Sequence, residues 1–242
     1  MYDCDLSLQN TDMLFSKREA RVLFKAGVNR DGWFGHEHLM DQVREAIDIF
    51  EERFGKDVKA LFMFDNATIH QKCAPDALSA MKMPKLQGWQ SKSAPVRMRN
   101  GVLPGLNMEQ EFYLPNPDPT SNKPGPFKGM AQILVERGFH NAFSLPAQCK
   151  GFKCKDVSLD AWCCCRCILY NQPDFRAQKP QLVEYIENRG HLAFYYPKFH
   201  CELNFIEQYW GAAKQRYRVL PWTSSISQME SNVRMCLDEV LS

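Results

Sequence analysis

The sequence has no apolar run that approaches the ~18 residues of a membrane-spanning helix. It also lacks the basic start and apolar stretch of a secretory signal, since it opens on MYDCDLSLQN. No internal repeat is visible. We therefore expect an intracellular protein that is not secreted and has no membrane partner. In such a compartment, thiols stay reduced.

An excess of charge of one sign is also missing. The 30 Lys and Arg residues nearly balance the 28 Asp and Glu residues, which leaves a net charge of +2. Bulk charge therefore does not point to nucleic acid, and only local clusters could do so. The composition, 45% hydrophobic and 24% charged, is ordinary for a globular protein. A chain of 242 residues is long enough for one domain with a real core.

Apolar periodicity predicts an α/β fold, in which strands alternate with helices. The first half predicts a strand over residues 19–27, a helix over 36–54 that ends at Gly55, and a strand over 59–64. The second half predicts one more strand, over 192–196. It also predicts four helices, over residues 128–138, 180–190, 203–218 and 226–241.

Pro, Gly, Asn and Ser crowd residues 83–126. A loop of this length is unusual inside a compact domain. We interpret it as part of an inserted, partly flexible segment.

A carboxylate follows the predicted strand in KALFMFDNATIH, where Asp65 comes directly after five apolar residues. Binding sites in open α/β sheets form beyond the carboxyl ends of strands. Capping of the next turn is the alternative role for this aspartate. Glu207 is expected in the first turns of the helix that follows the 192–196 strand. Carboxylates in two such places can converge on Mg²⁺, and a pair of such ions can clamp a phosphodiester.

The stretches DNATIH (65–70) and PKFHCELNFIEQYWGAAKQRYR (197–218) resemble the transposase/integrase superfamily of Asp-Asp-Glu (DDE) endonucleases, in particular its fungal, mariner-like members. Phe205 stands where proline is typical. Glu202 occupies an upstream acidic position that is not a metal ligand in the family. The likeness continues through ARVLFKAGVNRDGWFG, DALSAMKMPK, GPFKGMAQILVERGF and CCCRCILYNQPDF, so it covers nearly the whole chain.

The resemblance implies one RNase H-like domain over residues 1–242, with a mixed sheet flanked by helices. A long Cys-containing insertion, residues 71–190, would separate the second Asp strand from the Glu helix, because Asp65 and Glu207 are 142 positions apart. Asp5, Asp65 and Glu207 would hold Mg²⁺ or Mn²⁺ for DNA cleavage or strand transfer. Asp3 is an alternative to Asp5.

The resemblance further implies DNA as partner, a nuclear location if the protein is functional, and a homodimer as a candidate assembly. The few residues before Asp5 leave a second hypothesis open, namely a truncated and catalytically silent transposon remnant that at most binds DNA. On that hypothesis Asp3 and Asp5 are solvated acids. An unrelated α/β binding protein is a third candidate.

Lys214, Arg216 and Arg218 lie on the helix that carries Glu207, where they could hold DNA phosphates. A solvated helix face is the alternative interpretation of this cluster. Tyr209 and Trp210 of the same helix are expected to be core anchors.

Six of the ten cysteines fall between residues 149 and 167, with the spacing C-x4-C-x8-CCC-x-C. Zinc takes four tetrahedral ligands, and thiolates suit it. We select Cys149, Cys154, Cys163 and Cys164 as the candidate zinc ligands. The alternative is a set of small apolar residues packed on a helix.

Overall fold

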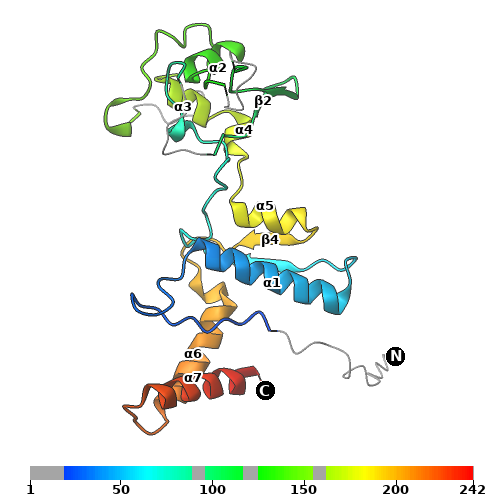
Figure 1. The fold of residues 1–242 in the computed structure, drawn as a ribbon, viewed down its shortest axis with the longest axis vertical. Coiled ribbons are helices and arrows are strands. Elements are labelled where there is room, and N and C mark those ends of the chain that lie inside the picture. The colour runs from blue at the N-terminus through cyan, green and yellow to red at the C-terminus, as the bar shows by residue number, and fades with distance from the viewer. Residues whose placement is uncertain (1–18, 89–95, 117–124, 155–161, 242) are drawn as a thin grey trace. The chain divides into compact units, whose positions relative to one another are not determined.

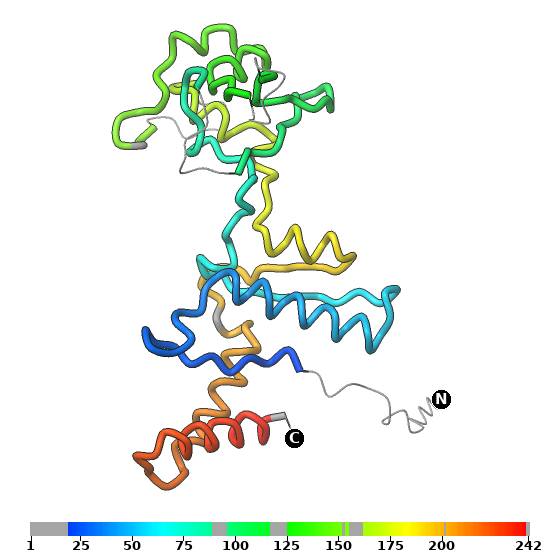
Figure 2. Tube along the Cα trace, viewed as in Figure 1, coloured from blue at the N-terminus to red at the C-terminus, as the bar shows by residue number. Residues whose placement is uncertain are grey.

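A computed structural model describes residues 19–88, 96–116, 125–154 and 162–241. The chain divides into two compact units (Figures 1 and 2). Unit 1 comprises residues 1–72 and 182–242, and unit 2 comprises residues 73–181. Unit 2 therefore lies inside the 71–190 range that we expect for an insertion.

The helices of unit 1 follow the sequence pattern closely. The helices expected over 36–54 and 226–241 have those bounds, and the strands expected over 59–64 and 192–196 are confirmed in shorter form. The elements are α1 (His36–Phe54), β1 (Leu61–Phe64), α5 (Gln181–Asn188), β4 (Leu192–Tyr195), the 3-10 turn η3 (Cys201–Leu203), α6 (Phe205–Arg218) and α7 (Ile226–Leu241).

Strands β1 and β4 pair in parallel, with Leu61 opposite Leu192 and Phe64 opposite Tyr195. One face of this two-stranded sheet is half-buried, because Phe62, Phe64 and Ala193 pack on a core built by α1 and α5. The buried members of that core are Leu39, Met40, Val43, Ile47, Leu182 and Ile186.

The other face of the β1–β4 sheet is apolar and exposed. Leu61, Met63, Leu192 and Phe194 expose between 39% and 59% of their surface. Parallel sheets are ordinarily covered on both faces. The described residues form two sheets of two strands each, so the wider mixed sheet of an RNase H-like fold stays a prediction.

The strand expected over residues 19–27 is wrong. Residues 19–26 are irregular, and Gly27 forms only an isolated bridge with Gly32. The segment is tied instead to helix α7 by charge, since Lys25 Nζ lies 2.9 Å from a Glu230 carboxylate oxygen. Arg21 pairs with Asp238 in the same way.

Unit 2 contains short elements. They are η1 (Ala80–Lys82), β2 (Gly101–Leu103), β3 (Met108–Gln110), α2 (Met130–Glu136), η2 (Lys150–Phe152), α3 (Cys165–Tyr170) and α4 (Pro173–Arg176). The helix expected over 128–138 is confirmed as α2. The interpretation of residues 83–126 as a loop is wrong in part, because β2 and β3 form an antiparallel hairpin there. Gly105 and Asn107 supply the positive φ angles of its turn.

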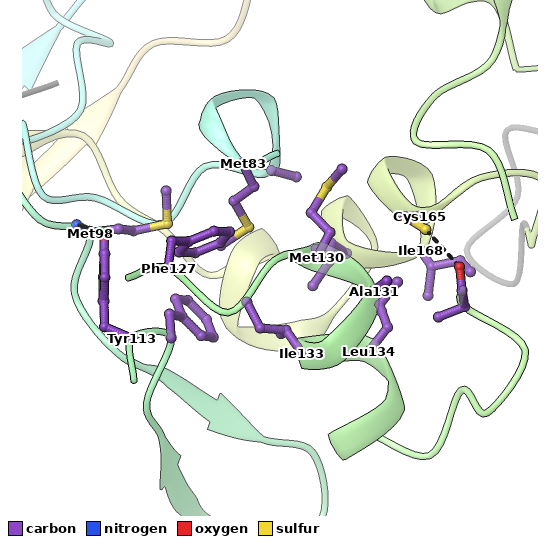
Figure 3. Close-up of a cluster of buried hydrophobic side chains, with 14 residues drawn as sticks. Met83, Met98, Tyr113, Phe127, Met130, Ala131, Ile133, Leu134, Cys165 and Ile168 are labelled. Carbon is purple, nitrogen blue, oxygen red and sulfur yellow. Dashed lines mark hydrogen bonds between the residues drawn. The ribbon is translucent and has the colours of Figure 1, made fainter. Parts of the chain in front are cut away.

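The core of unit 2 gathers around helices α2 and α3 (Figure 3). Met130, Ile133 and Leu134 of α2 are fully buried, and Ile168 of α3 lies in the same cluster. Met83 joins them from the segment after η1. Burial of such side chains stabilises each by about 1.5–3 kcal/mol relative to exposure.

A buried ion pair joins the hairpin to the helices of unit 2. Arg137 donates two hydrogen bonds to Asp174, of 2.7 and 2.8 Å, and the two side chains are 0% and 8% exposed. The Val102 amide also donates to Asp174, at 3.0 Å. Gly101 is required beside this pair, because a Cβ there would lie 2.7 Å from both side chains.

We predict that Asp174→Asn destabilises unit 2 by about 3–5 kcal/mol, because the variant leaves the Arg137 charge buried without a counter-charge. Hydrogen exchange of the α2 and α3 amides measures the change. The partly exposed pair of Asp76 and Arg99 provides the control. Asp76→Asn should cost about 1 kcal/mol or less, and equal costs for the two variants would contradict the prediction.

The Asp174 pair also predicts a pH dependence. Burial acts to raise the pKa of the Asp174 carboxyl, but hydrogen bonds from Arg137, Val102 and Phe175 outweigh it and hold the pKa below its usual value. Its stabilisation is therefore complete above the unfolded pKa of about 3.9 and is lost as pH falls through the lower folded pKa. Exchange protection of unit 2 should drop more steeply with acid in the wild type than in Asp174→Asn. If exchange protection falls equally steeply with acid in both proteins, the pH dependence does not come from Asp174.

Candidate metal centre and strand edge

The carboxyl ends of β1 and β4 form one edge of the sheet, because the strands are parallel. Two hydrogen bonds fix the segments that leave this edge. Asn66 Nδ2 donates to the Tyr196 carbonyl at 2.7 Å, and the Tyr195 hydroxyl donates to the His70 carbonyl at 2.7 Å. These hydrogen bonds hold together the two segments that follow the strands, and Asp65 is the first residue after β1.

Asp65 does cap the following turn. Its Oδ1 accepts a hydrogen bond of 2.9 Å from the Ala67 amide and lies 2.6 Å from His70 Nδ1. The Asp65 side chain nevertheless stays 49% exposed, so a cation from solvent can reach the carboxylate. Its capping role and a role as a metal ligand are compatible.

Glu207 lies in the first turn of α6, as the sequence predicts, and its side chain is exposed. A helix N-terminus carries a partial positive charge that favours a carboxylate. Glu202, the upstream acid, accepts a 2.7 Å hydrogen bond from His200, which lowers the pKa of its carboxyl.

Within the described ranges, neither Asp65 nor Glu207 belongs to a group of three or more metal-ligating side chains. Asp3 and Asp5 lie outside the described residues. The three-acid Mg²⁺ or Mn²⁺ site therefore stays a prediction.

The basic residues of α6 face solvent. Lys214, Arg216 and Arg218 are exposed, and Arg216 Nε lies 3.8 Å from a Glu239 oxygen. Lys214 and Arg218 also border an apolar hollow of about 280 Å³ between α6 and α7.

Tyr209 and Trp210 of α6 were both expected to be core anchors, and the prediction is right for one of them. Tyr209 is half-buried and its hydroxyl donates to the Leu237 carbonyl at 3.0 Å. Trp210 is 41% exposed, so its prediction as a core anchor is wrong.

Four cysteines of unit 2 come together as the sequence predicts. The Sγ atoms of Cys149, Cys154, Cys163 and Cys164 all lie within 4.8 Å of one another. A tetrahedral zinc site with bonds of ~2.3 Å has sulfur–sulfur edges of about 3.8 Å. Shifts of about 1 Å or less would therefore close these thiols on a metal ion, and the cluster can hold one.

Local structure decides which thiols face this cluster. Cys164 is the N-cap of α3, and its Sγ accepts the Cys167 amide at 3.4 Å. Cys165 points the other way, into the core, and its thiol donates to the Ala142 carbonyl at 3.3 Å (Figure 3). The packing interpretation of the cysteines therefore holds for Cys165, which is fully buried.

The thiols of the cluster shift one another's pKa values. A hydrogen bond with Cys163 raises the pKa of Cys149 to about 12, and the same partner raises that of Cys154 to about 12. Burial acts to raise the pKa of Cys163, but hydrogen bonds from the neighbouring thiols outweigh it and lower that pKa. Because zinc binds thiolates, a metal that enters this cluster must displace protons.

Cys167 is a residue that the selection from sequence missed. Its thiol influences the pKa of the Cys154 and Cys163 thiols and accepts a hydrogen bond from the Asn171 side chain at 3.9 Å. With Cys149, Cys154 and Cys164 it also lines a hollow of about 320 Å³. The C-x2-C spacing from Cys164 to Cys167 was the available signal.

A scan against protein-family models and searches among curated proteins and solved structures gave no match to this chain. No helix in the described part of the chain is both long and apolar enough to cross a membrane. The chemistry of the strand edge and of the cysteine cluster is therefore the basis on which a function can be assigned.

Proposed function

We propose that this chain is a DDE-type transposase or endonuclease-like domain, which cleaves or joins DNA phosphodiester bonds with a divalent metal ion. The observation that carries the proposal is the parallel register of β1 and β4. Because of it, Asp65 and the segment that leads to Glu207 leave the sheet at the same edge. The resemblance of residues 65–70 and 197–218 to the DDE pattern supports the same assignment.

The side chains at this edge suit a hard cation. Mg²⁺ prefers oxygen ligands and commonly takes only one or two protein carboxylates, with water and substrate phosphate as the remaining ligands. Asp65 and Glu207 would hold the ion, with Asp5 or Asp3 as the third acid. The ion supplies charge stabilisation to the reacting phosphate. His70 orients the Asp65 carboxylate, and Lys214 and Arg218 bind backbone phosphates. A nuclear location and a homodimer belong to the same proposal.

A silent remnant that at most binds DNA is the second candidate. Two observations favour it. The Asp65 carboxylate already serves the turn and His70, and the described sheet has two strands with one apolar face exposed. The exposed cations of α6 would then account for DNA binding without cleavage.

We further propose that the cysteine cluster of unit 2 holds a structural zinc ion. Its donors are thiols, which suit Zn²⁺ and not Mg²⁺ or Mn²⁺. Cys149 and Cys154 flank η2, whereas Cys163 and Cys164 lead into α3, so zinc would cross-link two separate segments. The ion would thereby stabilise unit 2 and have no part in the cleavage of DNA.

We predict that the protein nicks supercoiled DNA in Mg²⁺ or Mn²⁺, and that Asp65→Asn and Glu207→Gln each lower the rate by about 100-fold or more. Both substitutions remove a negative ligand and keep the size of the side chain. The measurement is conversion of a supercoiled plasmid to its open-circular form.

Glu202→Gln is the matched control for nicking, since Glu202 is an exposed acid that is paired with His200. It should nick at the wild-type rate. Full activity in Asp65→Asn or Glu207→Gln would refute the site. Salt-dependent DNA binding by a wild type that does not nick would favour the silent remnant.

We predict that purified protein contains one zinc ion per chain, and that its removal by a chelator lowers the melting temperature of unit 2. Zinc that is added back at about 1,000 times its Kd should restore about 4 kcal/mol of stability. Elemental analysis and thermal melts measure the two quantities, with Mg²⁺ as the control ion. A zinc content well below one per chain would exclude the proposed centre.

A further inference from the structure

A fifth thiol, that of Cys167, lies beside the four that converge in the cysteine cluster of unit 2. Cys167 lines the same hollow as Cys149, Cys154 and Cys164, and its thiol influences the pKa of the Cys154 and Cys163 thiols. Zinc in a structural site takes four ligands. One of the five sulfurs must therefore stay outside the coordination sphere of a single ion.

The geometry of α3 indicates which sulfurs compete. Cys164 is the N-cap of this helix and Cys167 is the third residue inside it, so the two are separated by i, i+3 spacing. Residues with that spacing lie side by side on a helix. They are also in contact, because the Cys167 amide donates to Cys164 Sγ at 3.4 Å. A metal ion that Cys164 binds is therefore within reach of Cys167 after a small shift.

The other three thiols have no such neighbour in the described residues. Cys149 and Cys154 lie on either side of η2, and Cys163 is the residue before the N-cap of α3. Cys165, the first residue of α3, donates to the Ala142 carbonyl in the core and faces away. Cys149, Cys154 and Cys163 therefore all lie outside α3, whereas Cys167 lies in its first turn, next to the N-cap Cys164.

We propose that Cys149, Cys154 and Cys163 are fixed ligands of the zinc centre, and that Cys164 and Cys167 are interchangeable fourth ligands. The inference rests on the proposed zinc centre and adds a property to it. The site tolerates the loss of either α3 thiol, because the remaining one completes the tetrahedron.

The test is binding of Zn²⁺ and Co²⁺ to a set of serine variants of the full chain. Cys164→Ser and Cys167→Ser should each keep one ion and the four-thiolate Co²⁺ spectrum, with affinity lowered by about tenfold or less. The double variant and Cys149→Ser should lose the four-thiolate spectrum and about 100-fold or more in affinity. Cys165→Ser is the matched control, since it places the same substitution in α3 outside the cluster, and it should bind as the wild type does.

Any other pattern of metal binding among these variants would overturn the inference. Loss of the ion in only one of the two α3 variants would make that residue the sole fourth ligand. Loss in both would make both thiols essential. Retention of four thiolates in Cys149→Ser would mean that any four of the five suffice. A wild type that binds neither metal would instead refute the zinc centre itself.

A measurement on the wild type avoids variants that fail to fold. In protein loaded with ¹¹³Cd, the β-protons of Cys149, Cys154 and Cys163 should show full coupling to the metal. Those of Cys164 and Cys167 should both show reduced coupling, as expected for two ligands that share one position. Full coupling at one of them and none at the other would contradict the exchange.

Discussion

The parallel pairing of β1 with β4 is the interaction on which the proposed nuclease edge depends. The paired residues Leu61 and Leu192 are 131 positions apart, so the connection between the strands contains all of unit 2 and α5. The entropy of closing such a connection grows only slowly with its length. A large unit can therefore lie between the strands while the register stays intact. An antiparallel pair would place Asp65 and Tyr196 at opposite ends of the sheet, and no common edge would exist.

Regular elements of unit 1 could be predicted because their signals are local. The single apolar stripe of residues 36–54 determines a helix whatever else the chain does. The strand expected over residues 19–27 failed because a strand needs a partner, and this segment found α7 instead. Five apolar residues precede Asp65, yet Leu61 and Met63 are exposed, because the covering of the outer face depends on distant segments that periodicity does not specify. Hairpin β2–β3 was missed because three residues per strand give too little alternation to detect.

The two candidate sites differ in how far their residues and geometry could be predicted from the sequence. Spacing identified four cysteines that do converge, because a cluster this dense along the chain stays dense in space. It could not tell the direction of each thiol, which the helical turn of α3 sets: Cys164 and Cys167 face the cluster, whereas Cys165 faces the core. For Asp65, the pattern located the strand end and offered capping of the next turn as an alternative role, but it did not show that His70 also contacts the carboxylate.

The two sites lie in separate units, and they differ in how much surrounding structure each of them needs. A nuclease edge needs several acids held to within a fraction of an ångström by a complete sheet. The thiol cluster needs only the segment around η2 and the first turn of α3. Unit 2 has short helices and a small hairpin, and its buried Arg137–Asp174 pair contributes specificity more than net stability. A zinc ion would add a cross-link between the segment around η2 and the start of α3. Metal in unit 2 would thus be retained by a chain whose other unit had lost catalysis, so bound zinc is evidence of a stable fold and not of nuclease activity.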